Sequence, residues 1–122
     1  MRKAPWNDTE NQALNSLYHR MHQGVQRTEN LNKAALIRIA QGQAKDTDRA
    51  TSTDGFAGLL AERSRGSIEA KLMNLTAVLH DLGRAQFSMS EHGYRPLSNY
   101  QADLKQAAVD YLNDVVGIET AA

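Results

Sequence analysis

A group of cationic, hydroxyl and amide side chains stands at the start of a helix predicted from apolar periodicity. The group consists of Arg63, Ser64, Arg65, Ser67, Lys71 and Asn74. Free backbone N–H groups at a helix N-terminus, flanked by guanidinium groups, form an anion-binding site. A helix with cations in its first turn and polar side chains behind them is typical of DNA major-groove recognition. The alternative interpretation is a core helix whose exposed side carries arginine and lysine.

The four histidines are the first candidates for metal or acid–base chemistry. His19 and His22 stand three residues apart, so a helix places them on one face. Two imidazoles are too few for a zinc site, and no carboxylate lies one turn away on that face. His80 and Asp81 are adjacent and point about 100° apart on a helix, which prevents a catalytic dyad. The pattern therefore favours packing or solvated histidines and predicts no metal site.

Motifs for nucleophilic or phosphate chemistry are missing from the sequence. It contains no G-x-S-x-G elbow, no P-loop and no G-x-G-x-x-G. The lack of cysteine excludes a thiol nucleophile and a cysteine-based metal site. Asp46 and Asp48 would bind a cation only weakly, because nothing else nearby matches a calcium loop. The sequence therefore predicts a non-enzymatic protein without a cofactor.

Length and composition indicate one ordinary folded domain. The chain has 122 residues, 41% of them hydrophobic, and 14 lysines and arginines balance 14 aspartates and glutamates. No apolar run approaches the ~20 residues of a membrane helix, and we expect no signal peptide and a cytoplasmic location. Residues 100–122 hold four acidic side chains and one basic one, so the rest carries the positive excess. This segregation permits a local basic face despite zero net charge.

Apolar periodicity predicts four or five helices and essentially no sheet. The first helix runs from about residue 8 to 23, with Asn7 and Glu10 as a capping box and Gly24 as its stop. Other helices are predicted over about 30–42, 54–62 and 65–82 and from Ser98 to Gly117. The short helix over 54–62 is expected to bury Phe56, Leu59 and Leu60.

The predicted central helix and the last helix have clear boundaries and apolar faces. In the helix over 65–82, Ile68, Leu72, Leu75, Leu79 and Leu82 form one apolar seam, Ser64 or Ser67 caps the start and Gly83 ends it. Ser98 and Gln101 make a capping pattern for the last helix, whose apolar face includes Val115. A polar loop over about 43–55, a connector over 84–97 and a frayed tail over about 117–122 complete the chain.

Three separated motifs carry a resemblance to a known kind of domain. The pattern R-S-x-G-S-I-E-x-K-x-x-N occupies residues 63–74, G-Y-x-P occupies 93–96 and N-Y-Q occupies 99–101. Together with Trp6 and the acidic residues after it, this order resembles the small helical N-terminal domain ahead of HNH endonuclease and restriction-type nuclease domains in bacteria. The tryptophan and the arginine–serine helix entry also faintly resemble a Myb or SANT-type helix-turn-helix. The resemblance implies a DNA-recognition or targeting module rather than the nuclease itself.

We therefore expect a single all-α domain over residues 1–122, a compact bundle of four to five helices with a helix-turn-helix-like core. The main hypothesis is a non-enzymatic DNA-binding or DNA-targeting module, linked to restriction or mobile-element functions, that contacts duplex DNA through the six residues named first. The alternative is a protein–protein adaptor or self-associating module without nucleic-acid binding, whose partner is a nuclease, another protein or a second copy.

Exposure of the cations distinguishes these two hypotheses. Exposed side chains of Arg63, Arg65 and Lys71 favour DNA binding, whereas pairing of these cations within the chain favours the adaptor. Trp6 is expected to cover the core rather than to stack on bases, and the two tyrosines Tyr94 and Tyr100 are expected to anchor the connector.

Overall fold

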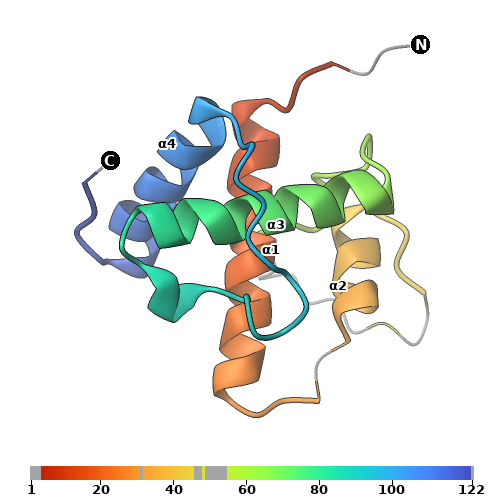
Figure 1. Cartoon of the computed structure of the whole chain (residues 1–122). Coiled ribbons are helices and arrows are strands. Elements are labelled where there is room, and N and C mark those ends of the chain that lie inside the picture. Colours follow the sequence, from red (N-terminus) through yellow and green to blue (C-terminus); the bar gives the residue numbers. More distant parts are fainter. Residues whose placement is uncertain (1–3, 31, 46–47, 49–54, 122) are drawn as a thin grey trace.

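The fold is all-helical in the parts of the chain that the computed structural model describes, which are residues 4–30, 32–45, 48 and 55–121. Its elements are α1 (Asp8–Gln26), α2 (Lys33–Ala40), α3 (Arg65–Asp81), the 3₁₀ turn η1 (Ala85–Phe87), α4 (Ala102–Tyr111) and the π-helical turn η2 (Leu112–Val116). Helix α3 crosses α1, with α2 beside its first turns and α4 near its other end (Figure 1). The all-α prediction is confirmed, and the helix-turn-helix-like core stays a prediction.

Helix α1 begins as its sequence predicts and ends later. The Asn7 side chain accepts a hydrogen bond from the Glu10 backbone N–H at 2.8 Å, and the Glu10 carboxylate accepts one from the Asn7 N–H at 3.1 Å. The predicted stop at Gly24 is wrong, because the helical hydrogen bonds continue and the Arg27 N–H still donates to the Gln23 carbonyl. The chain then turns away at Thr28, where φ is +53°.

The helix predicted over 54–62 is wrong for the described residues, since 55–62 form consecutive turns. Gly58 has a φ of +72°, which interrupts a right-handed helix. The N–H groups of Gly58 and Leu60 instead donate to the last carbonyls of α2, those of Ile39 and Ala40, at 2.9 and 2.8 Å. Leu60 is buried as expected, whereas Leu59 is 45% exposed.

The start predicted for the last helix is also wrong, because α4 begins at Ala102 and no side chain caps it. The preceding connector is held in an extended conformation across α3, where the Leu97 N–H donates to the Met73 carbonyl (Figure 1). Gly117, with a φ of +82°, ends the helical region as predicted. The tail is not frayed over 118–121, since the Asn113 side chain binds both backbone groups of Thr120.

Helix α3 supplies the central part of the core. Its predicted apolar seam is buried except at its end, and it packs against buried residues of α1, α2, α4 and the turns after α2. The buried members of the seam are Ile68, Leu72, Leu75 and Leu79. Ser64 caps the helix, as predicted. None of the described helices combines the length and the apolar character that crossing a membrane requires.

We predict that Leu72→Ala and Leu79→Ala each lower the free energy of unfolding by about 2–5 kcal/mol, because each leaves a cavity in the core. Urea unfolding followed by circular dichroism measures the change. Leu59→Ala is the matched control, and its half-exposed side chain predicts a loss below about 1 kcal/mol. Equal losses in all three variants would contradict this description of the core.

Candidate functional site

The guanidinium group of Arg63 lies inside the protein rather than on its surface. Its Nε and Nη2 donate to the two carboxylate oxygens of Glu10, both at 2.7 Å. Its Nη1 and Nη2 also donate to the backbone carbonyls of Ala4 and Pro5, at 2.7 and 3.0 Å. This buried ion pair fixes the segment before α1 to the residue that precedes α3, and it leaves Arg63 with little capacity for a ligand.

The half-buried Lys71 lies beside this ion pair, near the ring of Trp6. The Arg63 guanidinium carbon lies 5.1 Å from the centre of this ring, and Lys71 Nζ lies 5.8 Å from it. Burial, and secondarily the charge of Arg63, lowers the pKa of Lys71. Trp6 is buried, as expected for a residue that covers the core. The tryptophan therefore covers the core, and the lysine lies half-buried against it.

Two more of the predicted DNA contacts have structural partners. The Ser64 side chain accepts a hydrogen bond from the Ser67 N–H at 3.1 Å and so caps α3. The buried Asn74 amide donates to the Leu97 carbonyl at 2.8 Å and to Asn99 Oδ1 at 3.3 Å. Asn74 thus holds the connector against α3, and its amide is not free to read a base edge.

Arg65 is the member of the predicted set whose guanidinium reaches solvent. Its side chain is 63% exposed, and its Nε forms a 2.9 Å ion pair with Glu69, one turn further along α3. An exposed pair of this kind contributes little to stability. The structure therefore divides the six predicted residues. Arg63, Ser64 and Asn74 make hydrogen bonds that hold the fold, Lys71 is half-buried beside Trp6, Ser67 is half-buried in the first turn of α3, and Arg65 faces outward.

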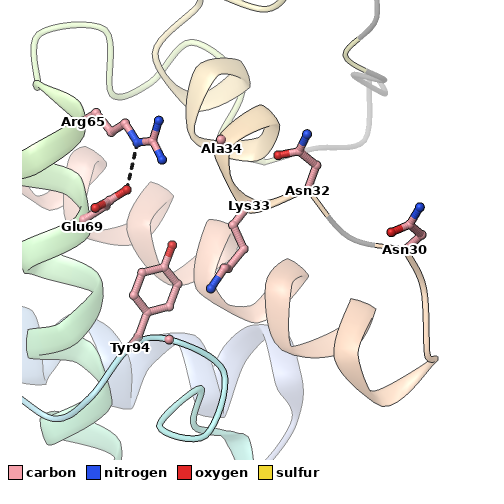
Figure 2. A pocket seen from close by; sticks show the side chains of 8 residues that line it. Asn30, Asn32, Lys33, Ala34, Arg65, Glu69 and Tyr94 are labelled. Carbon is pink, nitrogen blue, oxygen red and sulfur yellow. Dashed lines mark hydrogen bonds and ion pairs between the residues drawn. The ribbon is translucent and has the colours of Figure 1, made fainter.

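Arg65 faces a polar pocket of about 520 Å³ between the first turns of α2 and α3 and the connector (Figure 2). We call it the polar pocket; it is lined by Asn30, Asn32, Lys33, Ala34, Arg65, Glu69, Gly93 and Tyr94. Lys33 Nζ donates to the His92 carbonyl at 2.7 Å and lies 4.8 Å from the centre of the Tyr94 ring. Lys33 is not among the predicted site residues, because nothing in its local sequence places it beside α3.

Tyr94 closes the floor of the polar pocket, and it is buried as predicted for an anchor of the connector. Its side chain is only 5% exposed, and its hydroxyl makes no hydrogen bond with the residues that the structure describes. Burial, with the nearby charge of Glu69, raises the pKa of Tyr94 to about 12, so the hydroxyl stays protonated at neutral pH. Figure 2 shows this hydroxyl directed into the space between Glu69, Arg65 and Lys33.

A second hollow, the apolar groove, lies on another side of the molecule. It has a volume of about 630 Å³ and is lined by Asp8, Thr9, Gln12, Ala13, Ser16, Gly55, Leu59, Tyr111 and Val115. Val115 is 64% exposed, although the sequence predicted it on the buried face of the last helix. The π-helical turn η2 is the physical reason, because it adds residues to the turn and rotates Val115 away from the core.

The histidines of α1 are packing residues in this structure. His19 lies 5.9 Å from the Tyr111 ring, and His22 lies 6.0 Å from the Phe87 ring, measured between ring centres. Burial is the main cause that lowers the pKa of both imidazoles, so they are neutral at pH 7. Within the described part of the chain, no three histidine, aspartate or glutamate residues gather as a metal site would need.

Comparison of the chain with protein-family models, with curated proteins and with solved structures finds no match. The resemblance to a helical domain ahead of HNH nuclease domains therefore stays a prediction. The candidate functional surfaces of the molecule are the polar pocket and the apolar groove.

The Glu10–Arg63 pair predicts a specific dependence of stability on pH. The hydrogen bond from Arg63 is the main cause that lowers the pKa of Glu10 from its ordinary value of 4.5. Because the pKa of Glu10 is lower in the folded protein, the pair stabilises the fold at pH values above the pKa of Glu10 in the unfolded chain. This stabilisation is lost as the pH falls through the pKa of Glu10 in the folded protein. The free energy of unfolding should therefore decrease as pH falls from about 5 to about 3.

Glu10→Gln should remove this part of the pH dependence and cost about 3–5 kcal/mol at pH 7, because it leaves the buried Arg63 without its counter-charge. Urea unfolding at a series of pH values measures both effects. Glu91→Gln, at an exposed position, is the control. If the free energy of unfolding of Glu10→Gln fell with pH as steeply as that of the wild type, Glu10 would not be the source of the pH dependence.

Two tyrosines offer a matched test of which hydroxyl groups hold the fold. The Tyr18 hydroxyl lies 2.7 Å from Thr76 Oγ1 and accepts a 2.6 Å hydrogen bond from the Met89 N–H. Tyr18→Phe leaves the buried Met89 N–H unpaired and should cost about 1–3 kcal/mol. Tyr94→Phe removes a hydroxyl without a protein partner and should change the free energy of unfolding by less than about 0.5 kcal/mol. Similar losses in the two variants would show that Tyr94 has a partner in the fold.

Proposed function

We propose that this chain is a non-catalytic interaction module that self-associates through the apolar groove. One observation carries the proposal: Leu59 and Val115, the large hydrophobic side chains that stay exposed in the described part of the chain, line the same groove. They come from segments more than fifty residues apart, so the fold assembles this surface from distant parts of the sequence. An exposed apolar patch of this kind is typical of an interaction site.

The extent of the groove along α1 favours a second copy as the partner. A smaller hollow continues the groove along α1 and shares Ser16, Gly55, Tyr111 and Val115 with it. Asp8 lines one end and Arg20 lines the other, twelve residues or about 18 Å apart along the helix. Arg20 is already paired with Glu29 at 2.8 Å, so the contact rests on the apolar side chains rather than on charge. These side chains face each other when two copies pack about a two-fold axis with α1 antiparallel.

DNA binding is the second candidate, and the exposed guanidinium of Arg65 in the first turn of α3 supports it. Its support is weaker than the sequence alone indicated. Arg63 is paired with Glu10, Lys71 packs on Trp6, and Asn74 holds the connector. Because Arg63 is paired within the chain, the structure favours the interaction module over DNA binding. Loss of DNA binding in Arg63→Ala would also be uninformative, because that variant loses stability.

The oligomeric state tests the proposal directly. We predict that the protein dimerises with increasing concentration, as measured by analytical ultracentrifugation from micromolar to millimolar protein. Val115→Lys and Leu59→Lys should each weaken the dimer by about tenfold or more, because a charge enters the apolar centre of the interface. Ala85→Lys, an equally charged change at an exposed position outside the groove, should have no effect. A monomer at every concentration, or equal effects of the three variants, would contradict self-association.

A further inference from the structure

We propose that the polar pocket binds the oxygens of a phosphate group. The pocket lies between the first turns of α2 and α3, apart from the apolar groove, and the two share no lining residue. The inference therefore does not depend on self-association. The phosphate group belongs either to a small phosphomonoester or to the backbone of a nucleic acid, since both present the same oxygens.

Hydrogen-bond donors dominate the lining of the pocket. Arg65 uses its Nε for Glu69, and neither of its Nη groups bonds to a described residue, so they present a two-pronged edge to the pocket. Lys33 Nζ has three protons and gives one to the His92 carbonyl. The Asn32 side chain accepts from the Ala35 N–H through Oδ1, which leaves its amide N–H groups as donors. Lys33 and Arg65 are the first residues of their helices, so both helix dipoles add positive potential.

The Tyr94 hydroxyl is the independent observation that points to a ligand. It belongs to a side chain that is 95% removed from solvent, it has no hydrogen-bond partner among the described residues, and it is directed into the pocket (Figure 2). The hydroxyl opens onto the pocket, so a ligand that enters the pocket can accept a hydrogen bond from it. A pKa of about 12 keeps the hydroxyl protonated, so it donates to an oxyanion at any physiological pH.

The charges and the backbone around the pocket set its preference for an anion. Lys33 and Arg65 outnumber Glu69, and the salt bridge with Arg65 partly compensates the Glu69 carboxylate.

Gly93 has a φ of +99°, and a Cβ on it would lie 2.5 Å from Lys33 Nζ. The glycine thus lets the connector approach the lysine closely enough to hold its ammonium group at the edge of the pocket.

Titration of ¹⁵N-labelled protein with inorganic phosphate, followed by two-dimensional NMR, tests the inference. We expect saturable shifts of the amides of Asn32, Lys33, Gly93 and Tyr94 that exceed those from sodium chloride at equal ionic strength. Tyr94→Phe should weaken binding about fivefold by removing one neutral hydrogen bond, and Arg65→Ala about tenfold by removing a charged one. Glu69→Gln should strengthen binding several-fold, because it removes the opposing charge. Lys105→Ala on α4 is the control and should bind as the wild type does.

Phenyl phosphate and a short DNA duplex, titrated in parallel, separate the two sources of the group. A small phosphomonoester as the natural ligand predicts that phenyl phosphate binds at least as tightly as inorganic phosphate and that the duplex binds no better. If the ligand is a nucleic-acid backbone, the duplex should bind more tightly than inorganic phosphate, and the variants should rank in the same order of affinity. The logarithm of the affinity should then fall with the logarithm of the salt concentration with a slope of about −1, as for one phosphate contact. Shifts no larger than those from chloride, or wild-type affinity in both Tyr94→Phe and Arg65→Ala, would overturn the proposal. The result is independent of the dimer, since Val115→Lys should bind phosphate normally.

Discussion

The rest of the fold depends on one constraint, the need to neutralise a guanidinium group in the interior. Arg63 stands between the turns that follow α2 and the first residue of α3, and it is buried there with Glu10 of α1. A buried charge of this kind is tolerated only with a counter-charge and further hydrogen bonds. The carboxylate of Glu10 supplies the charge, and the carbonyls of Ala4 and Pro5 supply the remaining acceptors. The start of α1, the segment that carries Trp6 and the start of α3 are therefore positioned together.

This constraint changes the meaning of the motif over residues 63–74. Cations and polar side chains at the start of a helix are typical of a DNA-contacting surface, yet most of this group serves the fold. Arg63 binds α1, Ser64 caps α3, Lys71 packs on Trp6 and Asn74 holds the connector. The outward-facing Arg65 lines the polar pocket with residues from other parts of the chain, Lys33 and Tyr94.

Local sequence was sufficient to predict the helical class, the capping box of α1, the Ser64 cap and the seam of α3, because these follow from periodicity and from side chains within one turn. It was insufficient where a distant segment decides the structure. The turns over 55–62 form because Gly58 and Leu60 bind the end of α2, and the start of α4 is delayed because Leu97 binds α3. The exposure of Val115 depends on a π-helical turn that the apolar pattern does not reveal. Both candidate surfaces arise from such long-range contacts, so the sequence did not predict them.

A double-mutant cycle on the buried pair tests the central claim most directly. The free energy of unfolding is measured in urea for the wild type, Glu10→Gln, Arg63→Met and the double variant. If Arg63 acts inside the fold through Glu10, each single change is strongly destabilising, and the double variant recovers a coupling free energy of about 2–3 kcal/mol. Additive effects, with a coupling free energy below about 0.5 kcal/mol, would show that Arg63 does not depend on Glu10. Arg63 would then again be a candidate DNA contact.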